Sequence, residues 1–160
     1  VPELKGLGIK MIETPIDRRG INPITDLGLF NQYTKLLKKI KPNIVVTYTI
    51  KPNIYGGFAC RIAKIPYAVN ITGLGTAFQK KGMLRSLVTM MYKVSLKKAK
   101  TVFFENSENM QIFLDERIIS KKQACLLNGA GVNLDHYTVL DYTQVQILFY
   151  KCNNHQHCFF

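Results

Sequence analysis

The sequence predicts an α/β fold with a parallel sheet, because strand patterns and helical patterns alternate along its length. Residues 44–49 and 67–71 are short runs rich in β-branched and aromatic residues, and each run leads into a polar loop that contains glycine or proline. A helical pattern follows each loop, as expected for right-handed crossovers between parallel strands. Ligands of such sheets bind at the carboxyl ends of the strands. The loops at 51–53 and 72–76 are therefore the first place to expect a binding site.

Length and charge limit the kinds of partner. The chain has 160 residues, enough for one domain with a hydrophobic core, and its 22 Lys and Arg against 10 Asp and Glu give a formal net charge of +12. Such a surplus favours an anionic partner, although a lysine-rich solvated surface explains it equally well. No RGG, RNP-like or zinc-finger pattern is present, so we expect no nucleic-acid partner. No apolar run approaches the roughly 20 residues that span a membrane.

The first half of the chain is expected to contain two strands and two helices. Residues 8–14 alternate enough for a strand, and Thr25 or Asp26 is expected to cap the helix that follows. Residues 44–49 are so apolar that both faces of their strand should be covered. A short helix over 54–63 then completes the first strand-helix unit.

The second half repeats the alternation. Strands are expected at 67–71, 101–104 and 124–127, with a longer helix over 83–100 and another that Ser107 caps. The last strand leads into a glycine-rich segment. We predict an incomplete Rossmann-like domain over 1–142 and an aberrant or truncated tail over 143–160.

The helix expected at 83–100 has two distinct faces. Its apolar face comprises Leu84, Leu87, Val88, Met91 and Val94. Its basic face includes Arg85, Lys93, Lys97 and Lys100. A buried stripe with a solvated lysine face is the more common arrangement, and a basic surface that rests on anionic lipid is the alternative.

Cysteine usage is that of a reducing, cytoplasmic compartment, because Cys60 and Cys125 lie in apolar contexts typical of free buried thiols. The tail holds four potential zinc ligands close together. They are Cys152, His155, His157 and Cys158. They lie too close in sequence for a helix and a strand to present them tetrahedrally, so we expect no metal site.

Two groups of residues could hold a phosphate or a sugar. The turn formed by Thr72, Gly73, Gly75 and Thr76 could offer backbone N–H groups and hydroxyls, although a tight turn that needs glycine has the same pattern. The second group is charged or polar and lies in other loops. It consists of Asp17, Arg18, Arg19, Lys51 and Asn53. Two neighbouring guanidinium groups suit bidentate phosphate binding, but a solvated turn explains them equally well.

Other nucleotide-binding patterns are excluded. The turn at 72–76 lacks the third glycine of the dinucleotide fingerprint, because Phe78 takes its place. No phosphate loop of P-loop enzymes, no nucleophile elbow and no serine–histidine–acid triad is legible. We therefore expect no cofactor, and no catalytic residue can be assigned.

Four segments in order resemble the N-terminal half of bacterial family 4 glycosyltransferases of the GT-B fold. They are residues 15–23 (Pro-Ile-Asp-Arg-Arg-Gly-Ile-Asn-Pro), 47–57 (Thr-Tyr-Thr-Ile-Lys-Pro-Asn-Ile-Tyr-Gly-Gly), 70–75 (Asn-Ile-Thr-Gly-Leu-Gly) and 128–133 (Asn-Gly-Ala-Gly-Val-Asn). The similarity covers about residues 6–142 and is greatest to enzymes that extend capsular, O-antigen or lipid-linked oligosaccharides. No single segment would be specific by itself.

The resemblance implies a Rossmann-like domain that receives the acceptor across a cleft from a second, nucleotide-sugar-binding domain. The loops at 17–23, 51–53 and 72–76 would line the acceptor side, and the segment 105–108 would lie at the next strand end. The second domain would follow an interdomain hinge. That hinge would be formed by Asn128, Gly129, Gly131 and Asn133. Transfer in this family retains anomeric configuration and usually needs no metal.

The sequence also departs from this family. It lacks the first strand with its glycine-bearing loop and the paired glutamates of the second domain. We therefore predict a truncated fragment of a retaining glycosyltransferase, inactive by itself, that in its full-length form transfers a sugar from a nucleotide-sugar to a polyprenyl-linked glycan. The predicted location is cytoplasmic, with possible peripheral contact at the inner face of the cell membrane.

Two alternatives remain open at this point. A nucleotide-sugar epimerase can have the same GT-B architecture. A non-catalytic basic module that binds nucleic acid or membrane would account for the charge.

Overall fold

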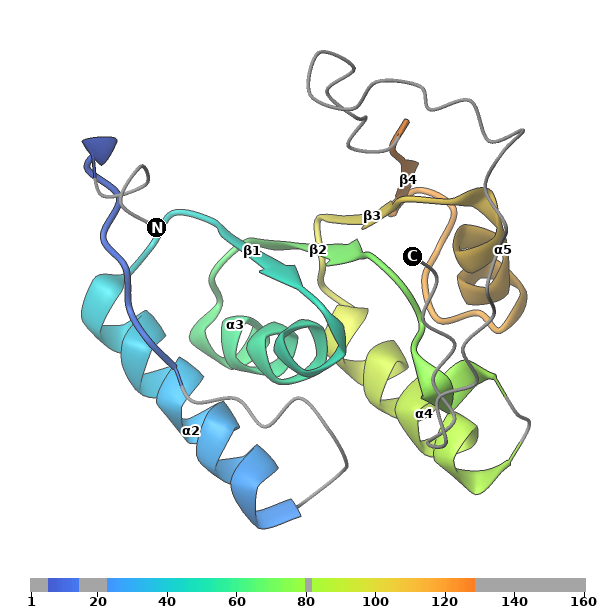
Figure 1. The fold of residues 1–160 in the computed structure, drawn as a ribbon, viewed down its shortest axis with the longest axis horizontal. Coiled ribbons are helices and arrows are strands. Elements are labelled where there is room, and N and C mark those ends of the chain that lie inside the picture. The colour runs from blue at the N-terminus through green and yellow to red at the C-terminus, as the bar shows by residue number, and fades with distance from the viewer. Residues whose placement is uncertain (1–5, 15–22, 80–81, 129–160) are drawn as a thin grey trace, which may run out of the picture. The chain divides into compact units, whose positions relative to one another are not determined.

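The structure is a computed structural model that describes residues 6–14, 23–79 and 82–128. The described residues form a four-stranded, fully parallel sheet with the strand order β1-β2-β3-β4 (Figure 1). The strands are β1 (Val45–Tyr48), β2 (Tyr67–Ile71), β3 (Thr101–Phe104) and β4 (Ala124–Leu126). The predicted α/β fold with a parallel, Rossmann-like sheet is confirmed.

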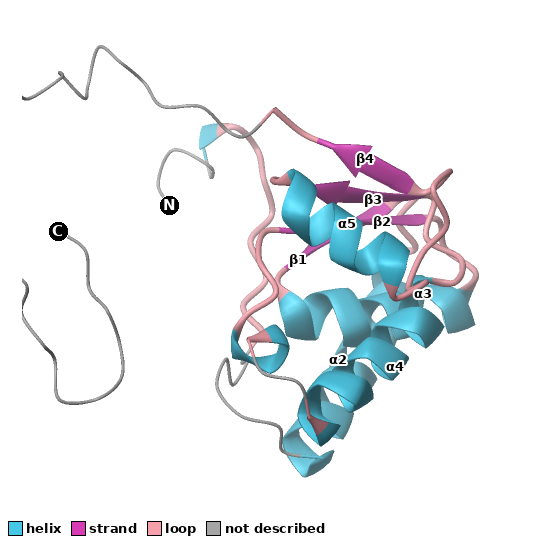
Figure 2. Cartoon of the chain, turned by 90° about the vertical axis from the view of Figure 1, so that its right-hand side faces the viewer, coloured by secondary structure: helices cyan, strands magenta, loops and turns pink. Residues whose placement is uncertain are grey.

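A helix lies in each connection between neighbouring strands, as parallel pairing requires. The α-helices are α2 (Pro23–Ile40), α3 (Gly57–Ala63), α4 (Met83–Leu96) and α5 (Ser107–Asp115). The short helices are the π-helix η1 (Pro52–Gly56), which leads directly into α3, and the 3₁₀-helix η2 (Thr76–Phe78). The helix expected over 54–63 therefore begins earlier, as a π-helix. Helices α2, α3 and α4 lie on the same side of the sheet (Figure 2).

Packing contacts identify the face of the sheet that the helices cover. A Cβ atom placed on Gly57 of α3 would lie 3.5 Å from the Tyr67 ring of β2. The ring centroids of Phe104 in β3 and Phe113 in α5 are 5.3 Å apart. Side chains alternate between the two faces of a strand, so Asn70 in β2 points away from the helices.

Aromatic side chains form the centre of the core. Phe113 packs edge-on against Tyr92 at 5.2 Å between ring centroids and stacks with Phe78 at 6.2 Å. Tyr92, Phe104 and Phe113 are fully buried. Burying a large apolar side chain stabilises a fold by about 1.5–3 kcal/mol, so this cluster fixes α4 and α5 against the end of β3.

The buried face of α4 differs from the predicted one. Leu84, Leu87 and Val94, which were expected to be buried, are 46%, 40% and 42% exposed. Val88 of the predicted face is buried, and the other buried residues are Tyr92, Ser95 and Leu96. The reason is the close approach of α4 to α3, where small residues meet: the Ser95 carbonyl oxygen lies 3.3 Å from the position of a Cβ on Gly57. The helix also ends at Leu96 and not at residue 100.

The strand expected at 8–14 is not formed. Residues 9–14 have no regular secondary structure, and Leu7, Ile9, Met11 and Ile12 are exposed. A strand needs a hydrogen-bonded neighbour, and within the described sheet β1 pairs only with β2.

Two predicted helix caps are also wrong. Helix α2 begins at Pro23, so Thr25 and Asp26 lie within its first turn. Helix α5 is capped by Asn106, whose side-chain oxygen accepts a hydrogen bond from the Asn109 N–H at 2.8 Å. Both Asn and Ser are good caps, and the sequence pattern did not distinguish them.

Clustering of contacts assigns residues 1–129 to one compact unit. All of the helices and strands named above belong to this unit. None of the helices in the described part of the chain combines the length and apolarity needed to cross a membrane.

Candidate functional site

The loops after β1 and β2 meet at the carboxyl edge of the sheet. A Cβ atom on Gly75 would lie 2.9 Å from the Ile50 Cδ1 atom, so the second loop rests directly on the first. Gly75 has φ +62°, a conformation that glycine adopts without strain. Thr49, which follows β1, has φ +66°, and a β-branched residue in this region is strained by about 1–3 kcal/mol. Such strain is concentrated at functional sites.

The turn at 72–76 presents its polar groups to solvent. Thr72, Gly75 and Thr76 are exposed and Gly73 is half-buried, whereas Leu74 is buried and anchors the turn. The turn therefore has the accessibility that a binding role requires.

Lys51 lies at the same edge, but its charge is already paired. The Lys51 ammonium lies 2.8 Å from Asp26 Oδ1, and the two side chains are only 13% and 6% exposed. The Tyr55 hydroxyl donates a hydrogen bond to the other Asp26 oxygen at 3.0 Å. Burial, and then the hydrogen bond and charge of Asp26, raise the pKa of Tyr55 to about 12. This network attaches α2 to the loop after β1.

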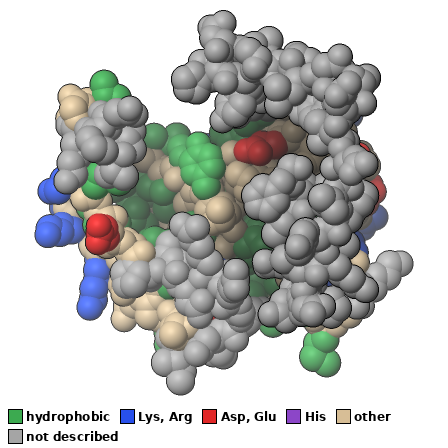
Figure 3. All heavy atoms as spheres, in the orientation of Figure 1, with side chains coloured by type: hydrophobic (Ala, Val, Ile, Leu, Met, Phe, Trp, Pro, Cys, Tyr) green, Lys and Arg blue, Asp and Glu red, His purple; other side chains and the backbone are tan. Residues whose placement is uncertain are grey.

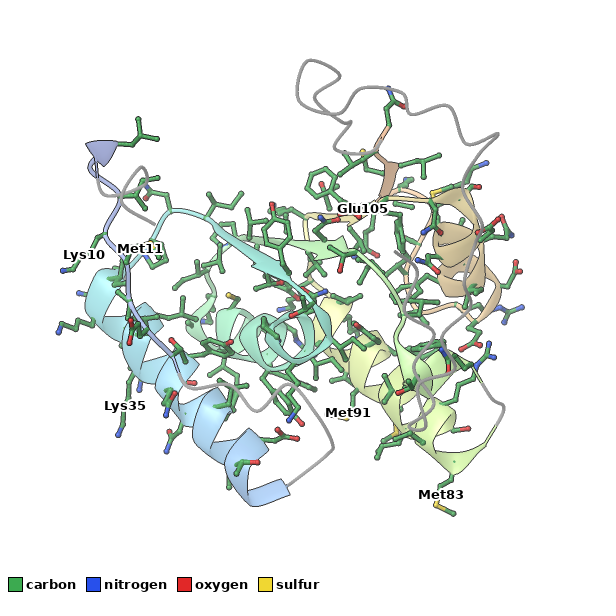
Figure 4. All side chains as sticks on the ribbon, viewed as in Figure 1. Lys10, Met11, Lys35, Met83, Met91 and Glu105 are labelled. Atoms are coloured by element: carbon green, nitrogen blue, oxygen red, sulfur yellow. The ribbon has the colours of Figure 1, made fainter. Side chains whose placement is uncertain are left out.

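Asn53 is buried and begins a second polar network. Its Nδ2 atom donates to the main-chain oxygen of Asn70 at 2.9 Å. The Asn70 side chain in turn donates to Glu105 Oε1 at 3.1 Å, and Glu105 is exposed just beyond β3. Figure 4 shows Glu105 at this end of the sheet.

Several buried oxygens near this edge have no hydrogen-bond partner within the described ranges. They are Thr47 Oγ1, Asn53 Oδ1, Asn70 Oδ1 and Tyr92 OH. The last is next to Asn53, whose side chain acts to lower the pKa of Tyr92 that burial raises. Buried polar atoms are normally satisfied by protein or ordered water. With Tyr92 OH and Asn53 next to each other, the acceptor left without a partner on the face away from the helices is Asn70 Oδ1.

A separate charged cluster surrounds the start of α4. Arg85 pairs with Glu116 and lies over the Phe78 ring at 5.4 Å, and the Thr89 hydroxyl donates to Glu116 at 2.9 Å. Burial acts to raise the pKa of Glu116, but these hydrogen bonds and the charges of Arg85 and Lys93 outweigh it, and the pKa is lowered. A cavity of about 560 Å³ opens beside the cluster.

The basic residues predicted on this helix are therefore not equivalent. Arg85 is engaged by Glu116, whereas Lys93, Lys97 and Lys100 are exposed. On the face seen in Figure 3, Lys and Arg gather on the left, where α2 lies, and hydrophobic side chains with an acidic group occupy the upper middle.

The remaining predicted residues have no described geometry, except Asn128, which is exposed. Six of the predicted site residues lie outside the described residues, namely Asp17, Arg18, Arg19, Gly129, Gly131 and Asn133. The potential zinc ligands of the tail, Cys152, His155, His157 and Cys158, also lie outside them. Within residues 6–14, 23–79 and 82–128, no group of three or more His, Cys, Asp or Glu is placed to hold a metal ion.

The sequence interpretation missed two residues that the structure brings to this edge. Asp26 was expected to cap a helix, and nothing in its sequence context indicated the ion pair with Lys51. Asn70 did carry a signal, because it is a polar residue in an otherwise apolar strand, Tyr67–Ile71.

A family model described as "Glycosyl transferase 4-like" matches residues 1–106, and the chain belongs to this family. The family 4 glycosyltransferase predicted from the four segments is confirmed. A relative from Campylobacter jejuni subsp. jejuni serotype O:2 is 29% identical over 140 residues, which make up 84% of this chain and 37% of the relative. That protein is the N,N'-diacetylbacillosaminyl-diphospho-undecaprenol alpha-1,3-N-acetylgalactosaminyltransferase.

A similar solved structure is the crystal structure of Acinetobacter baumannii MurG, with a TM-score of 0.48 and 16% identity. The match covers 82% of this chain and 33% of MurG. The chain thus spans about a third of the length of either protein.

Proposed function

We propose that this chain is the acceptor-side part of a glycosyltransferase that transfers a sugar from a nucleotide-sugar to a glycan carried on a polyprenyl diphosphate. The observation that carries the proposal is the carboxyl edge of the sheet, where strained Thr49 and the exposed turn at 72–76 meet in a chain of the glycosyl transferase 4-like family. The name of the Campylobacter relative specifies a diphospho-undecaprenol acceptor, which supports this acceptor class.

In this proposal the two loops have different tasks. Thr72, Gly73, Gly75 and Thr76 contact the acceptor, because they are accessible. Lys51 is half-buried and Asn53 is buried, and the networks described above engage both and keep the loop after β1 in position. This division narrows the predicted roles of Lys51 and Asn53 from direct binding to support.

The charge that holds the diphosphate would come from Arg18 and Arg19, with Asp17 orienting them. Lys51 is a poor candidate because a nearby carboxylate already neutralises it. A diphosphate needs cationic or N–H donors, and paired guanidinium groups supply them bidentately. The hinge formed by Asn128, Gly129, Gly131 and Asn133 would lead to the donor-binding domain, and transfer would proceed with retention and without metal.

Helix α4 is the part of the described fold best suited to rest on a membrane. Its first turn exposes Met83 (90% exposed), which points away from the fold in Figure 4, and Met90 is 57% exposed. Further apolar residues, Leu84, Leu87 and Val94, are exposed along the same helix. The exposed Lys93, Lys97 and Lys100 could contact anionic headgroups, as in interfacial helices generally. A cytoplasmic enzyme held peripherally at the inner face of the membrane would meet a polyprenyl-linked acceptor there.

The test is a binding measurement with a fluorescently labelled, short-chain polyprenyl diphosphate that carries one N-acetylated sugar. Anisotropy of the purified chain should show saturable binding, weakened about tenfold or more by Arg18→Ala with Arg19→Ala, since charge-assisted hydrogen bonds are lost. Thr72→Val should weaken it several-fold. Thr34→Val removes a hydroxyl that bonds within α2, at Phe30, and is the matched control.

Four outcomes would contradict the proposal. Equal binding by all variants would mean that the edge does not contact the acceptor. Conversion of a nucleotide-sugar into its epimer would favour the epimerase alternative, and salt-sensitive competition by a DNA duplex at low concentration would favour a nucleic-acid module. Turnover of a nucleotide-sugar by the purified chain, abolished in Arg19→Ala or Thr72→Val, would show that it holds more than the acceptor side.

A further inference from the structure

A row of three residues crosses the end of the sheet on the face away from the helices. Tyr48 of β1 lies opposite Asn70 of β2, and Asn70 lies opposite Phe103 of β3. Thr47 and Phe104 pack toward the helical side, so their neighbours Tyr48 and Phe103 face the other way, and Glu105 follows two residues after Phe103. The row itself therefore presents two aromatic rings with an amide between them, and the Glu105 carboxylate lies on the same face just beyond β3.

The Glu105 carboxylate beside this row is held in a fixed direction. The Asn70 side chain is 94% removed from solvent (6% exposed) and donates to Glu105 Oε1 at 3.1 Å. The hydrogen bond that Asn53 Nδ2 donates to the Asn70 main-chain oxygen, at 2.9 Å, also holds this end of β2 in position. A carboxylate oxygen can only accept, so the Asn70 nitrogen must face Glu105, and this leaves Asn70 Oδ1 as an acceptor without a partner in the described part of the chain.

The chemistry of the row selects among ligands. The ion pairs present within the described ranges are Lys51–Asp26 and Arg85–Glu116, so none of the cations in these ranges pairs with Glu105. A phosphate would be repelled by this carboxylate. Hydroxyl and amide N–H groups are the donors that unpaired acceptors bind, and an exposed aromatic ring adds an apolar surface for carbon-bound hydrogens. A sugar ring offers both at once.

We propose that Tyr48 and Glu105 bind a pyranose ring of the acceptor glycan, with Asn70 as the positioning residue that aims the carboxylate. This inference rests on the proposed function and adds the part of the acceptor that the diphosphate-binding residues do not reach. Neighbouring strands lie about 4.8 Å apart, so one sugar ring can lie with its apolar face on Tyr48 of β1 and still extend toward Glu105 at the end of β3. Its hydroxyl or acetamido N–H donors then reach Glu105. Tyr48 is 55% exposed and needs no rearrangement to accept it.

The experiment uses the purified chain with ¹³C-labelled tyrosine rings and three probes without lipid or diphosphate. The probes are methyl α-N-acetylgalactosaminide, methyl β-N-acetylglucosaminide and methyl α-glucoside. Tyr48→Phe assigns the Tyr48 ring signal by its disappearance. We expect one of these glycosides to shift the Tyr48 ring signal and to receive magnetisation from the Tyr48 ring in a saturation-transfer experiment.

Variants then test each role. Glu105→Gln and Tyr48→Ala change exposed side chains and should each raise the Kd about tenfold, as expected for loss of one charge-assisted hydrogen bond or of the ring contact. Glu108→Gln changes an exposed glutamate at the start of α5 and is the matched control. Asn70→Asp sets two carboxylates against each other and should abolish binding. The double variant Asn70→Asp with Glu105→Gln again places a donor opposite an acceptor. It should bind at least as tightly as Glu105→Gln alone. A merely structural role of Asn70 does not predict this rescue.

The outcomes separate this inference from the proposed function. If the polyprenyl diphosphate binds through Arg18, Arg19 and Thr72 but no glycoside perturbs Tyr48, the sugar subsite is refuted alone. If a glycoside binds through Tyr48 and Glu105 while the polyprenyl diphosphate does not bind, the proposed acceptor class fails and the subsite stands. Kd values within twofold for Glu105→Gln and Tyr48→Ala would overturn the inference, as would Mg²⁺ shifting the Tyr48 signal in place of any sugar.

Discussion

Replacing Lys51 by Met tests whether this residue supports the fold or binds a ligand. In the structure its ammonium lies 2.8 Å from Asp26, and the side chains are 13% and 6% exposed. The substitution leaves the Asp26 carboxylate buried with only the Tyr55 hydroxyl as a partner. Breaking a buried pair by removing one member costs about 3–5 kcal/mol, against a total stability of about 5–15 kcal/mol for a domain.

The measurement is urea denaturation of the purified chain, followed by far-ultraviolet circular dichroism. Lys51→Met should lower the free energy of unfolding by about 3–5 kcal/mol. Adding Asp26→Asn removes the unpaired charge, so the double variant should be more stable than Lys51→Met alone. Lys38→Met removes an exposed lysine from α2 and should change stability by less than about 0.5 kcal/mol.

Three results would refute this reasoning. A loss below about 1 kcal/mol for Lys51→Met, the range of surface pairs, would mean that the pair is solvated. Additive effects of the two substitutions would mean that Asp26 and Lys51 are not coupled. A large loss of acceptor affinity without any loss of stability would return Lys51 to the role of a direct ligand.

Three further predictions concern other residues. Gly75→Ala should lower the free energy of unfolding by about 1–3 kcal/mol, measured by urea denaturation, because Gly75 has φ +62°. Gly73→Ala should leave it nearly unchanged, because the space around a Cβ at Gly73 is open. Equal effects of the two substitutions would contradict the turn geometry. Burial raises the pKa of Cys60 to about 11, so iodoacetamide at pH 8 should label it only after unfolding, as mass spectrometry of its peptide would show; rapid labelling of the folded chain would refute this. The pKa of Glu116 is lowered in the folded chain, so the stability that its carboxylate contributes is present above the ordinary pKa of 4.5 and is lost as the pH falls through the lowered pKa. The difference in unfolding free energy between the unmodified chain and Glu116→Gln should therefore shrink with acidification. A constant difference would count against the ion pair.

Much of the fold could be predicted because its signals are local. The strands at 67–71 and 101–104 have the predicted bounds, since each is a short apolar run between polar turns. Their parallel pairing followed from the intervening helices. The turn at 72–76 was found for the same reason, because glycines mark a position that other residues cannot occupy without strain.

The misplaced helix caps were local errors, whereas two other failed expectations depended on contacts between distant residues. The pattern of 8–14 suits a strand, but pairing decides whether a strand forms. The helix at 83–96 has two possible apolar stripes, and its close approach to Gly57 through Ser95 selected the one that contains Tyr92.

The candidate site divides in the same way. The sequence by itself determined that polar loops end the strands, that the chain belongs with family 4 glycosyltransferases, and that threonine and glycine line one loop. Only the tertiary structure decided that Lys51 is neutralised by a residue 25 positions earlier, and that Asn70 fixes a carboxylate 35 positions later. The physical reason is that the charge and direction of a side chain depend on its partners in space, and parallel pairing brings those partners from separate strand-helix units to one edge of the sheet.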